Sequence, residues 1–186
     1  RERPERILDP FCGSGTIPIE ASIYAGGIAP GLERSFLFQR QPHFREAAYG
    51  FIRRSLKEEP SPRFQSDIIG SDWDAAAVDL AGRRNQAAGT RAQFLGQDAF
   101  SPETAALLGP GTLVITNPPY GERLKGGLPL YRRLIELLTE STTPGVLIVP
   151  RSIEKFLPLE ASGPRLSFEN GGIGVALRWV AAQRTR

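Results

Sequence analysis

The stretch Asp9-Pro10-Phe11-Cys12-Gly13-Ser14-Gly15-Thr16 decides the fold class of this chain. It follows a short apolar strand predicted at Arg6-Ile7-Leu8 and precedes a helix predicted over Thr16–Ala25. Glycines in such a strand-to-helix turn let the backbone approach a ligand closely, because a side chain there would block it. The pattern is not that of a phosphate loop, since no lysine follows the glycines. A tight turn without a ligand is the alternative interpretation.

Segments typical of strands and helices alternate along the rest of the chain. Further strands are predicted at 65–71, 92–96, 112–116, 145–149, 165–169 and 174–181, and helices at 44–59, 75–88, 102–108, 130–140 and 152–156. Residues 30–44 show no periodicity and are predicted to form a loop. Repeated strand–helix units favour a parallel sheet covered by helices on both faces, and Asn170-Gly171-Gly172 predicts a closing hairpin. We therefore predict an α/β fold with a Rossmann-like seven-stranded sheet, mostly parallel with one antiparallel strand near the C-terminus.

Composition excludes several classes of protein. The 186 residues suffice for one domain with a core and are too few for two ordinary domains. No apolar run reaches the roughly 18 residues of a membrane helix, and the N-terminus lacks the apolar segment of a signal peptide. One cysteine, Cys12, permits no internal disulfide, and one histidine, His43, leaves no Cys/His zinc cluster. We therefore expect no metal, no membrane partner and a cytoplasmic location.

Two features of the composition point to partners outside this chain. There is no methionine, not even at position 1, so we expect a domain of a longer chain that carries an N-terminal partner domain. Of the 23 basic residues, 20 are arginine, whose planar guanidinium suits phosphates, although GC-rich codons would produce the same excess. Most of these residues could be solvated helix faces. The candidates for RNA contact are Arg40, Arg45, Arg53, Arg54, Arg123, Arg132 and Arg133.

Acidic residues follow the second and third predicted strands, where ligands of α/β sheets bind. Asp72, in Gly70-Ser71-Asp72-Trp73, could accept hydrogen bonds from ribose hydroxyls, and Trp73 offers an apolar face to a purine. Asp72 and Asp74 could both cap the following helix, and we assign the cap to Asp74 and the ribose to Asp72. Asp98, before Ala99, could hold an adenine amino group or simply precede a helix.

The turn Asn117-Pro118-Pro119-Tyr120 follows the apolar strand that ends at Thr116. Its two prolines remove two backbone donors, which leaves the Asn117 side-chain oxygen and the Pro118 carbonyl as acceptors. Such acceptors suit a planar NH2 group whose nitrogen attacks a carbon, and Tyr120 could stack on the ring that bears the amine. A proline-rich turn without a site is the alternative.

Taken together, these motifs resemble those of the S-adenosylmethionine-dependent amino-methyltransferases. The strings Ile17-Pro18-Ile19-Glu20-Ala21, Ile28-Ala29-Pro30-Gly31-Leu32 and Gly121-Glu122-Arg123-Leu124 are similar to those of bacterial RNA guanine-N2-methyltransferases that carry an N-terminal THUMP domain, particularly the large-subunit rRNA type. The hairpin Phe168-Glu169-Asn170-Gly171-Gly172 resembles theirs as well.

The resemblance implies a single methyltransferase domain over 1–186, without the THUMP domain or the segment that joins it. The implied cofactor is S-adenosyl-L-methionine, with S-adenosyl-L-homocysteine as product. The methionine end would be shaped by Asp9, Phe11, Gly13, Ser14, Gly15 and Thr16. Asp72 would bind the ribose, with Trp73, Asp98 and Ala99 around the adenine. Asn117, Pro118, Pro119 and Tyr120 would bind the exocyclic N2 amine of a guanine, most plausibly in 23S rRNA.

The expected reaction is an in-line displacement in which the guanine nitrogen attacks the sulfonium methyl group, without a strong general base. Several alternatives remain. They are methylation of a guanine in tRNA, of adenine or cytosine amines in DNA, or of a glutamine side chain, and RNA binding without catalysis. In one group of DNA enzymes the proline-proline motif precedes the glycine turn, whereas here it follows it.

Overall fold

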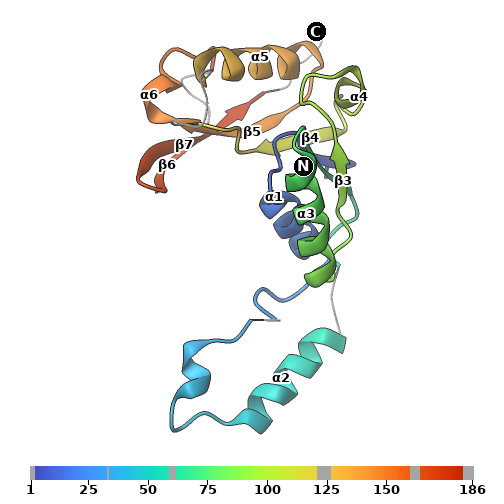
Figure 1. Cartoon of the computed structure of the whole chain (residues 1–186), viewed down its shortest axis with the longest axis vertical. Coiled ribbons are helices and arrows are strands. Elements are labelled where there is room, and N and C mark those ends of the chain that lie inside the picture. The colour runs from blue at the N-terminus through green and yellow to red at the C-terminus, as the bar shows by residue number, and fades with distance from the viewer. Residues whose placement is uncertain (1–2, 33, 59–61, 121–126, 160–163, 182–186) are drawn as a thin grey trace.

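The computed structural model describes residues 3–32, 34–58, 62–120, 127–159 and 164–181. It consists of a body built on one sheet and an arm that projects from the body (Figure 1). Within these residues, no helix is long and apolar enough to cross a membrane.

The body is organised by a seven-stranded sheet in the order β3-β2-β1-β4-β5-β7-β6. The strands are β1 (Arg6–Asp9), β2 (Asp67–Asp72), β3 (Gln93–Gly96), β4 (Thr112–Thr116), β5 (Gly145–Pro150), β6 (Arg165–Asn170) and β7 (Ile173–Val180). All neighbours from β3 to β5 pair parallel, and β7 runs antiparallel to both β5 and β6. The predicted fold, including the single antiparallel strand, is confirmed. Strand order changes direction between β1 and β4, which is where such sheets open a crevice at their carboxyl edge.

Helices cover both faces of the sheet because consecutive residues of its central strands, such as Ile7 and Leu8, are apolar and point to opposite faces. The helices of the body are α1 (Thr16–Ala25), α3 (Ala75–Ala87), α4 (Pro102–Ala105), α5 (Gly127–Glu140) and α6 (Arg151–Glu154). Ile7 of β1 and Ile68 of β2 pack with Ala25 of α1 on one face. The neighbouring Leu8 packs in the larger core with Leu134 and other residues of α5 on the opposite face. Figure 1 shows α5 and the pair α1–α3 on opposite sides of the strands.

The arm holds the clearest difference from the sequence-based expectation. The segment 30–44, predicted to be a loop, contains the 3-10 helix η1 (Leu37–Arg40), and α2 (Glu46–Glu58) follows it. Local aromatic contacts, which periodicity does not reveal, stabilise this turn: the Phe38 ring lies 5.6 Å from that of Tyr49 in α2. The other elements differ from expectation only at their ends, as when α4 stops at Ala105 instead of Leu108.

Candidate active site

The glycine turn after β1 forms the centre of the carboxyl edge. Gly13 and Gly15 both have positive φ angles, of 50° and 84°, which residues other than glycine rarely adopt. They differ in their surroundings. A Cβ at Gly15 would lie 2.9 Å from Cβ of Ala81, whereas a Cβ at Gly13 would meet nothing within 4 Å. Gly15 therefore serves the packing of the turn on α3, and Gly13 borders open space.

Asp72 ties the glycine turn to the end of β2. Its carboxylate accepts a hydrogen bond of 2.9 Å from the Gly13 N–H and one of 3.0 Å from the Asp74 N–H. Asp74 caps α3 by accepting a hydrogen bond from the Ala76 N–H. The prediction that Asp74, and not Asp72, caps this helix is therefore confirmed. Trp73 is 79% exposed and lies beside this carboxylate in the chain.

Asp9 is the most strongly perturbed acid of the site. Its side chain is buried, and it accepts hydrogen bonds from the Thr116 hydroxyl at 2.6 Å and from the Phe11 N–H at 3.1 Å. Burial raises the pKa of Asp9 to about 7, because desolvation and the nearby Asp72 carboxylate outweigh these two hydrogen bonds. The group therefore changes charge near neutral pH.

Two aromatic rings lie beside the end of β3. Asp98 accepts a hydrogen bond of 2.8 Å from the Phe100 N–H, which fixes the turn that carries the buried Ala99. Phe100 packs edge-on against Phe11, with 6.1 Å between the ring centroids, and the Arg133 guanidinium lies 4.0 Å above the Phe100 ring. The glycine turn and the Asp98 turn thus meet through apolar contact.

The Asn117–Tyr120 turn follows β4, next to β1. The Asn117 side-chain oxygen is buried, and no described residue hydrogen-bonds to it. The sequence predicted a free acceptor at the carbonyl of Pro118, but the structure shows it partly occupied. The Tyr131 hydroxyl of α5 lies 3.1 Å away and shares its proton with the carbonyl of Ile148. A carbonyl has two lone pairs, so one remains for a ligand. Gly121, Glu122 and Arg123 lie outside the described residues.

Three residues that were not predicted to take part in the site support these turns. The Arg84 guanidinium donates to the Ser14 hydroxyl at 2.7 Å, and the Asn170 amide donates to the Tyr120 hydroxyl at 2.5 Å. The third is Tyr131, whose pKa is raised by burial and by Tyr120, so its hydroxyl stays protonated. Only Asn170 had a local signal, as part of the hairpin turn. In the sequence, nothing distinguishes Arg84 and Tyr131 from the other residues of their predicted helices.

Cys12 and His43 do not form a catalytic pair. Cys12 is buried, and desolvation together with the Asp9 and Asp72 carboxylates raises the pKa of its thiol to about 12, far from a reactive thiolate. His43 is exposed on the arm. Among the described residues, no group of three or more His, Cys, Asp or Glu side chains could hold a metal ion.

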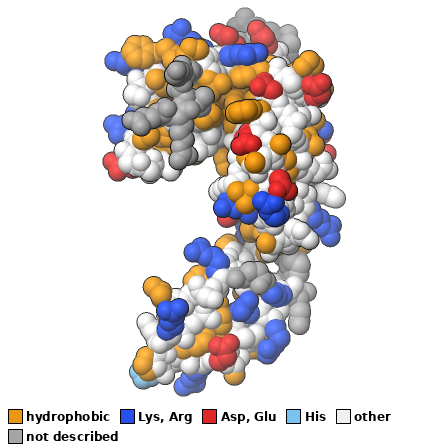
Figure 2. Space-filling view, viewed as in Figure 1, with side chains coloured by type: hydrophobic (Ala, Val, Ile, Leu, Met, Phe, Trp, Pro, Cys, Tyr) orange, Lys and Arg blue, Asp and Glu red, His pale blue; other side chains and the backbone are white. Residues whose placement is uncertain are grey.

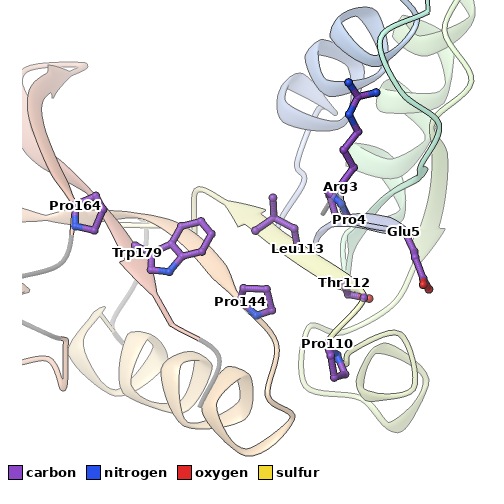
Figure 3. Close-up of a pocket in the computed structure, with 10 residues that line it drawn as sticks. Arg3, Pro4, Glu5, Pro110, Thr112, Leu113, Pro144, Pro164 and Trp179 are labelled. Atoms are coloured by element: carbon purple, nitrogen blue, oxygen red, sulfur yellow. The ribbon is translucent and has the colours of Figure 1, made fainter. Parts of the chain in front are cut away.

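A large cavity lies away from these turns. It has a volume of about 1190 Å³ and is lined at the amino edge of the sheet by Arg3, Glu5, Leu113, Pro144 and Trp179, among others (Figure 3). None of the predicted site residues lines it. We assign the ligand site to the carboxyl edge instead, because the convergent polar groups and the perturbed Asp9 lie there.

Comparison with known proteins gives a consistent assignment. Residues 2–156 match the family described as UPF0020, RMKL-like, methyltransferase domain. The chain is similar to the ribosomal RNA large subunit methyltransferase K/L of Shewanella sp. (strain ANA-3), with 42% identity over 127 residues, covering 65% of this chain and 17% of that protein. The protein of the same name from Shewanella sp. (strain MR-4) is 44% identical over 127 residues. The chain thus spans 17% of the length of these relatives.

Two solved structures are similar to this chain over all or nearly all of its length. SMU.472, solved in complex with SAH, is 28% identical and has a TM-score of 0.75, covering 100% of this chain and 50% of that chain. A protein from Listeria monocytogenes str. 4b F2365, named a predicted N6-adenine-specific DNA methylase, is 26% identical and has a TM-score of 0.73, covering 95% of this chain and 46% of that one. The chain therefore corresponds to about half of each of these structures.

Proposed function

Because the chain belongs to the UPF0020 family of RMKL-like methyltransferase domains, we propose that residues 1–186 form one S-adenosylmethionine-dependent domain that methylates the exocyclic N2 amine of a guanine in RNA. Large-subunit rRNA is the proposed substrate, in line with the names of the relatives. The observation that carries the proposal is the buried Asn117 oxygen without a hydrogen-bond partner among the described residues. A buried acceptor left without a donor costs about 1–3 kcal/mol, so an N–H from a ligand would complete it.

The carboxyl edge fits the cofactor. Gly13 borders open space at the turn, where a side chain would fill the volume that the ligand needs. The Asp72 carboxylate is oriented by two backbone N–H groups and keeps lone pairs for ribose hydroxyls. Asp9, when ionised, would attract the cationic methionine end. When bound, the cofactor supplies an electrophilic methyl group.

The chain's own residues would act on the guanine amine. This amine is a weak nucleophile because its lone pair is delocalised into the ring. Asn117 Oδ1 and the remaining lone pair of Pro118 would accept its two N–H groups, which favours the tetrahedral, positively charged nitrogen of the transition state. Tyr120 would stack on the base and hold the nitrogen in line with the methyl group. The cofactor would supply the methyl group and keep the electron pair of its carbon–sulfur bond as the thioether product, and the proton that the methylated nitrogen loses would pass to solvent water.

The test compares Asn117→Ala with Asn117→Asp. Labelled S-adenosylmethionine is offered with undermodified rRNA, tRNA and DNA, and the methylated nucleoside is identified by mass spectrometry. Removing one preorganised transition-state partner should lower turnover by roughly a hundredfold or more, with cofactor affinity unchanged. Asn117→Asp retains an acceptor oxygen at this position and replaces the amide NH2 with a second one, so it should retain more activity than Asn117→Ala.

The products decide between the substrates. N2-methylguanosine in rRNA is the expected product. N2-methylguanosine in tRNA would move the proposal to another RNA, and methyladenine or methylcytosine in DNA would overturn it. Equal loss of turnover and cofactor affinity in Asn117→Ala would argue against the role given to Asn117.

A further inference from the structure

The arm, defined as residues 34–58, projects away from the sheet and takes no part in the site described above (Figure 1). It contains η1 and α2 and leaves the body after α1. An excursion of this size has to be stabilised by contacts of its own, and its aromatic residues supply them.

Four rings hold the arm in one shape. Phe36 stacks on Phe38 at 5.5 Å, and Phe38, Phe44 and Tyr49 lie 5.5 to 5.8 Å from one another. Aromatic pairs at such distances are worth about 0.5–1.5 kcal/mol each beyond their burial. These contacts join η1 to α2, so the arm presents its charged residues from an ordered surface.

The arm carries the positive charge of the chain. Residues 34–58 contain six Lys and Arg but only two Glu, a net charge of +4. With the adjoining Glu33 and Glu59, the segment 33–59 still carries +2 of the chain's net charge of +3. Figure 2 shows basic side chains distributed over the arm, with acidic ones mostly on the body. Arg34, Arg40, Arg45 and Arg54 are exposed. A body that is nearly neutral with a basic arm indicates a polyanionic partner at the arm.

The arm faces the same hollow as the hairpin that supports the site. Figure 2 shows the molecule as an open C, hollowed between the arm and the upper part of the body. The β6–β7 hairpin, whose Asn170 holds Tyr120, lies on the hollow's side of the body in Figure 1. An extended polyanion could therefore contact the arm while one of its bases reaches the carboxyl edge.

We propose that the arm binds the phosphate backbone of the RNA substrate and thereby helps to present the target guanine to the Asn117–Tyr120 turn. This proposal rests on the proposed function, because it takes RNA as the substrate. Phosphates supply a regular array of negative charge that exposed arginines bind bidentately. Phe51 of α2, which is 66% exposed, could stack on an unpaired base of the same RNA.

A protein partner is the competing occupant of this surface. Phe51, Ile52 and Leu56 are exposed large apolar residues on α2, and such residues also suit contact with another polypeptide. The net charge of +4 favours RNA, because the cores of protein interfaces are depleted in charged residues. The experiment therefore includes a measurement that reports association between proteins.

The test compares the double variant Arg45→Gln/Arg54→Gln of the arm with the double variant Arg83→Gln/Arg91→Gln of the body, where both arginines are also exposed. The probe is a labelled transcript of protein-free large-subunit rRNA, titrated at salt concentrations from about 0.05 to 0.2 M. Loss of two phosphate contacts should make the slope of log K against log salt shallower by about 1.4 and weaken binding roughly tenfold or more at 0.1 M salt. The body variant should bind like the wild type, and both variants should bind SAH like the wild type.

Three results would overturn the proposal. The first is wild-type protein that does not bind the transcript, and the second is an arm variant with unchanged affinity and slope. The third is an arm variant that binds RNA like the wild type but has a lower mass in sedimentation equilibrium, the measurement of association between proteins, which would assign the arm to a protein partner. Methyl transfer by the wild type separates the two proposals. Transfer to guanine with no effect of the arm variant would remove the arm's role alone. RNA binding through the arm without guanine methylation would remove the proposed reaction and leave the arm's role intact.

Discussion

The side-chain amide of Asn170 donates a hydrogen bond of 2.5 Å to the phenolic oxygen of Tyr120, which lies 50 residues earlier in the chain. This contact joins the β6–β7 hairpin to the turn that would hold the target base. The hairpin is itself anchored, because Glu154 of α6 accepts hydrogen bonds from Arg165 of β6 and Arg178 of β7. Asn170 is thus a positioning residue that orients the Tyr120 ring from a fixed support.

Asn170→Ala should lower methyl transfer while leaving cofactor binding unchanged. A neutral hydrogen bond of this kind contributes about 1 kcal/mol, so the expected loss in kcat/KM is about fivefold. SAH affinity, measured by titration calorimetry, should stay within error because Asn170 contacts only Tyr120 among the residues discussed for the site. The neighbouring Ser167→Ala on the exposed β6 is the matched control. Equal activity of Asn170→Ala and Ser167→Ala would show that the Tyr120 contact does not position the ring.

Tyr131→Phe should weaken both the fold and the reaction. Its hydroxyl donates to the carbonyls of Pro118 and Ile148, so the variant leaves these two acceptors without that donor. The expected loss is about 1–2 kcal/mol in the free energy of unfolding, measured with urea. Because the Pro118 carbonyl is proposed to accept from the target amine as well, kcat should fall more than KM rises. Tyr24→Phe, on the exposed side of α1, should change neither quantity. Stability lost with turnover intact would limit Tyr131 to a structural role.

Sequence reasoning identified the strands, the strand-end motifs and the order of elements because each leaves a local signal. The short apolar strand at Arg6-Ile7-Leu8, the glycines of the first turn and the paired glycines of the hairpin all follow from the chemistry of neighbouring residues. Assigning the helix cap to Asp74 and not to Asp72 also succeeded, since a cap requires an acceptor directly before the helix.

The remaining features depend on residues far apart in the chain. The link between Asn170 and Tyr120, and that between Arg84 and Ser14, bridge 50 and 70 residues, and no periodicity reveals such pairs. The burial that raises the pKa of Asp9 likewise arises only when β1 lies between β2 and β4. The 3-10 helix in the arm escaped prediction because rings that pack on one another, and not an apolar stripe, hold it.

Gly13→Ala and Gly15→Ala should separate ligand binding from folding. Both substitutions place a side chain at a positive φ, which costs roughly 1–2 kcal/mol. In Gly15→Ala the new Cβ would also meet Ala81 and Phe94 at 2.9 to 3.0 Å, so this variant should lose the most stability in urea unfolding. In Gly13→Ala the Cβ enters open space, so its larger effect should be on SAH affinity. Weaker SAH binding in Gly15→Ala than in Gly13→Ala, after correction for unfolded protein, would contradict this assignment of roles.

Asp9 should make both stability and cofactor affinity depend on pH, in opposite directions. The folded protein holds the Asp9 proton up to a pKa of about 7, whereas the unfolded chain releases it near 3.8. The folded state therefore binds more protons between these values, and the Asp9 contribution to stability, full below about pH 4, is lost as the pH rises to about 7. A cationic ligand favours ionised Asp9, so the affinity for S-adenosylmethionine, whose sulfonium is positively charged, should rise with pH by up to tenfold per unit below 7 and level off above it. Titration calorimetry at pH 6, 7 and 8 measures this rise.

Asp9→Asn supplies the control for this pH dependence. The amide oxygen can still accept from Thr116 and Phe11, but the side chain no longer titrates. Its affinity for S-adenosylmethionine should be nearly independent of pH from 6 to 8 and should lie near or below the wild-type value at pH 6, where Asp9 is mostly protonated. If the wild-type affinity is also flat over this range, Asp9 does not face the cationic end of the cofactor. If Asp9→Asn keeps the wild-type slope, another group is responsible for the titration.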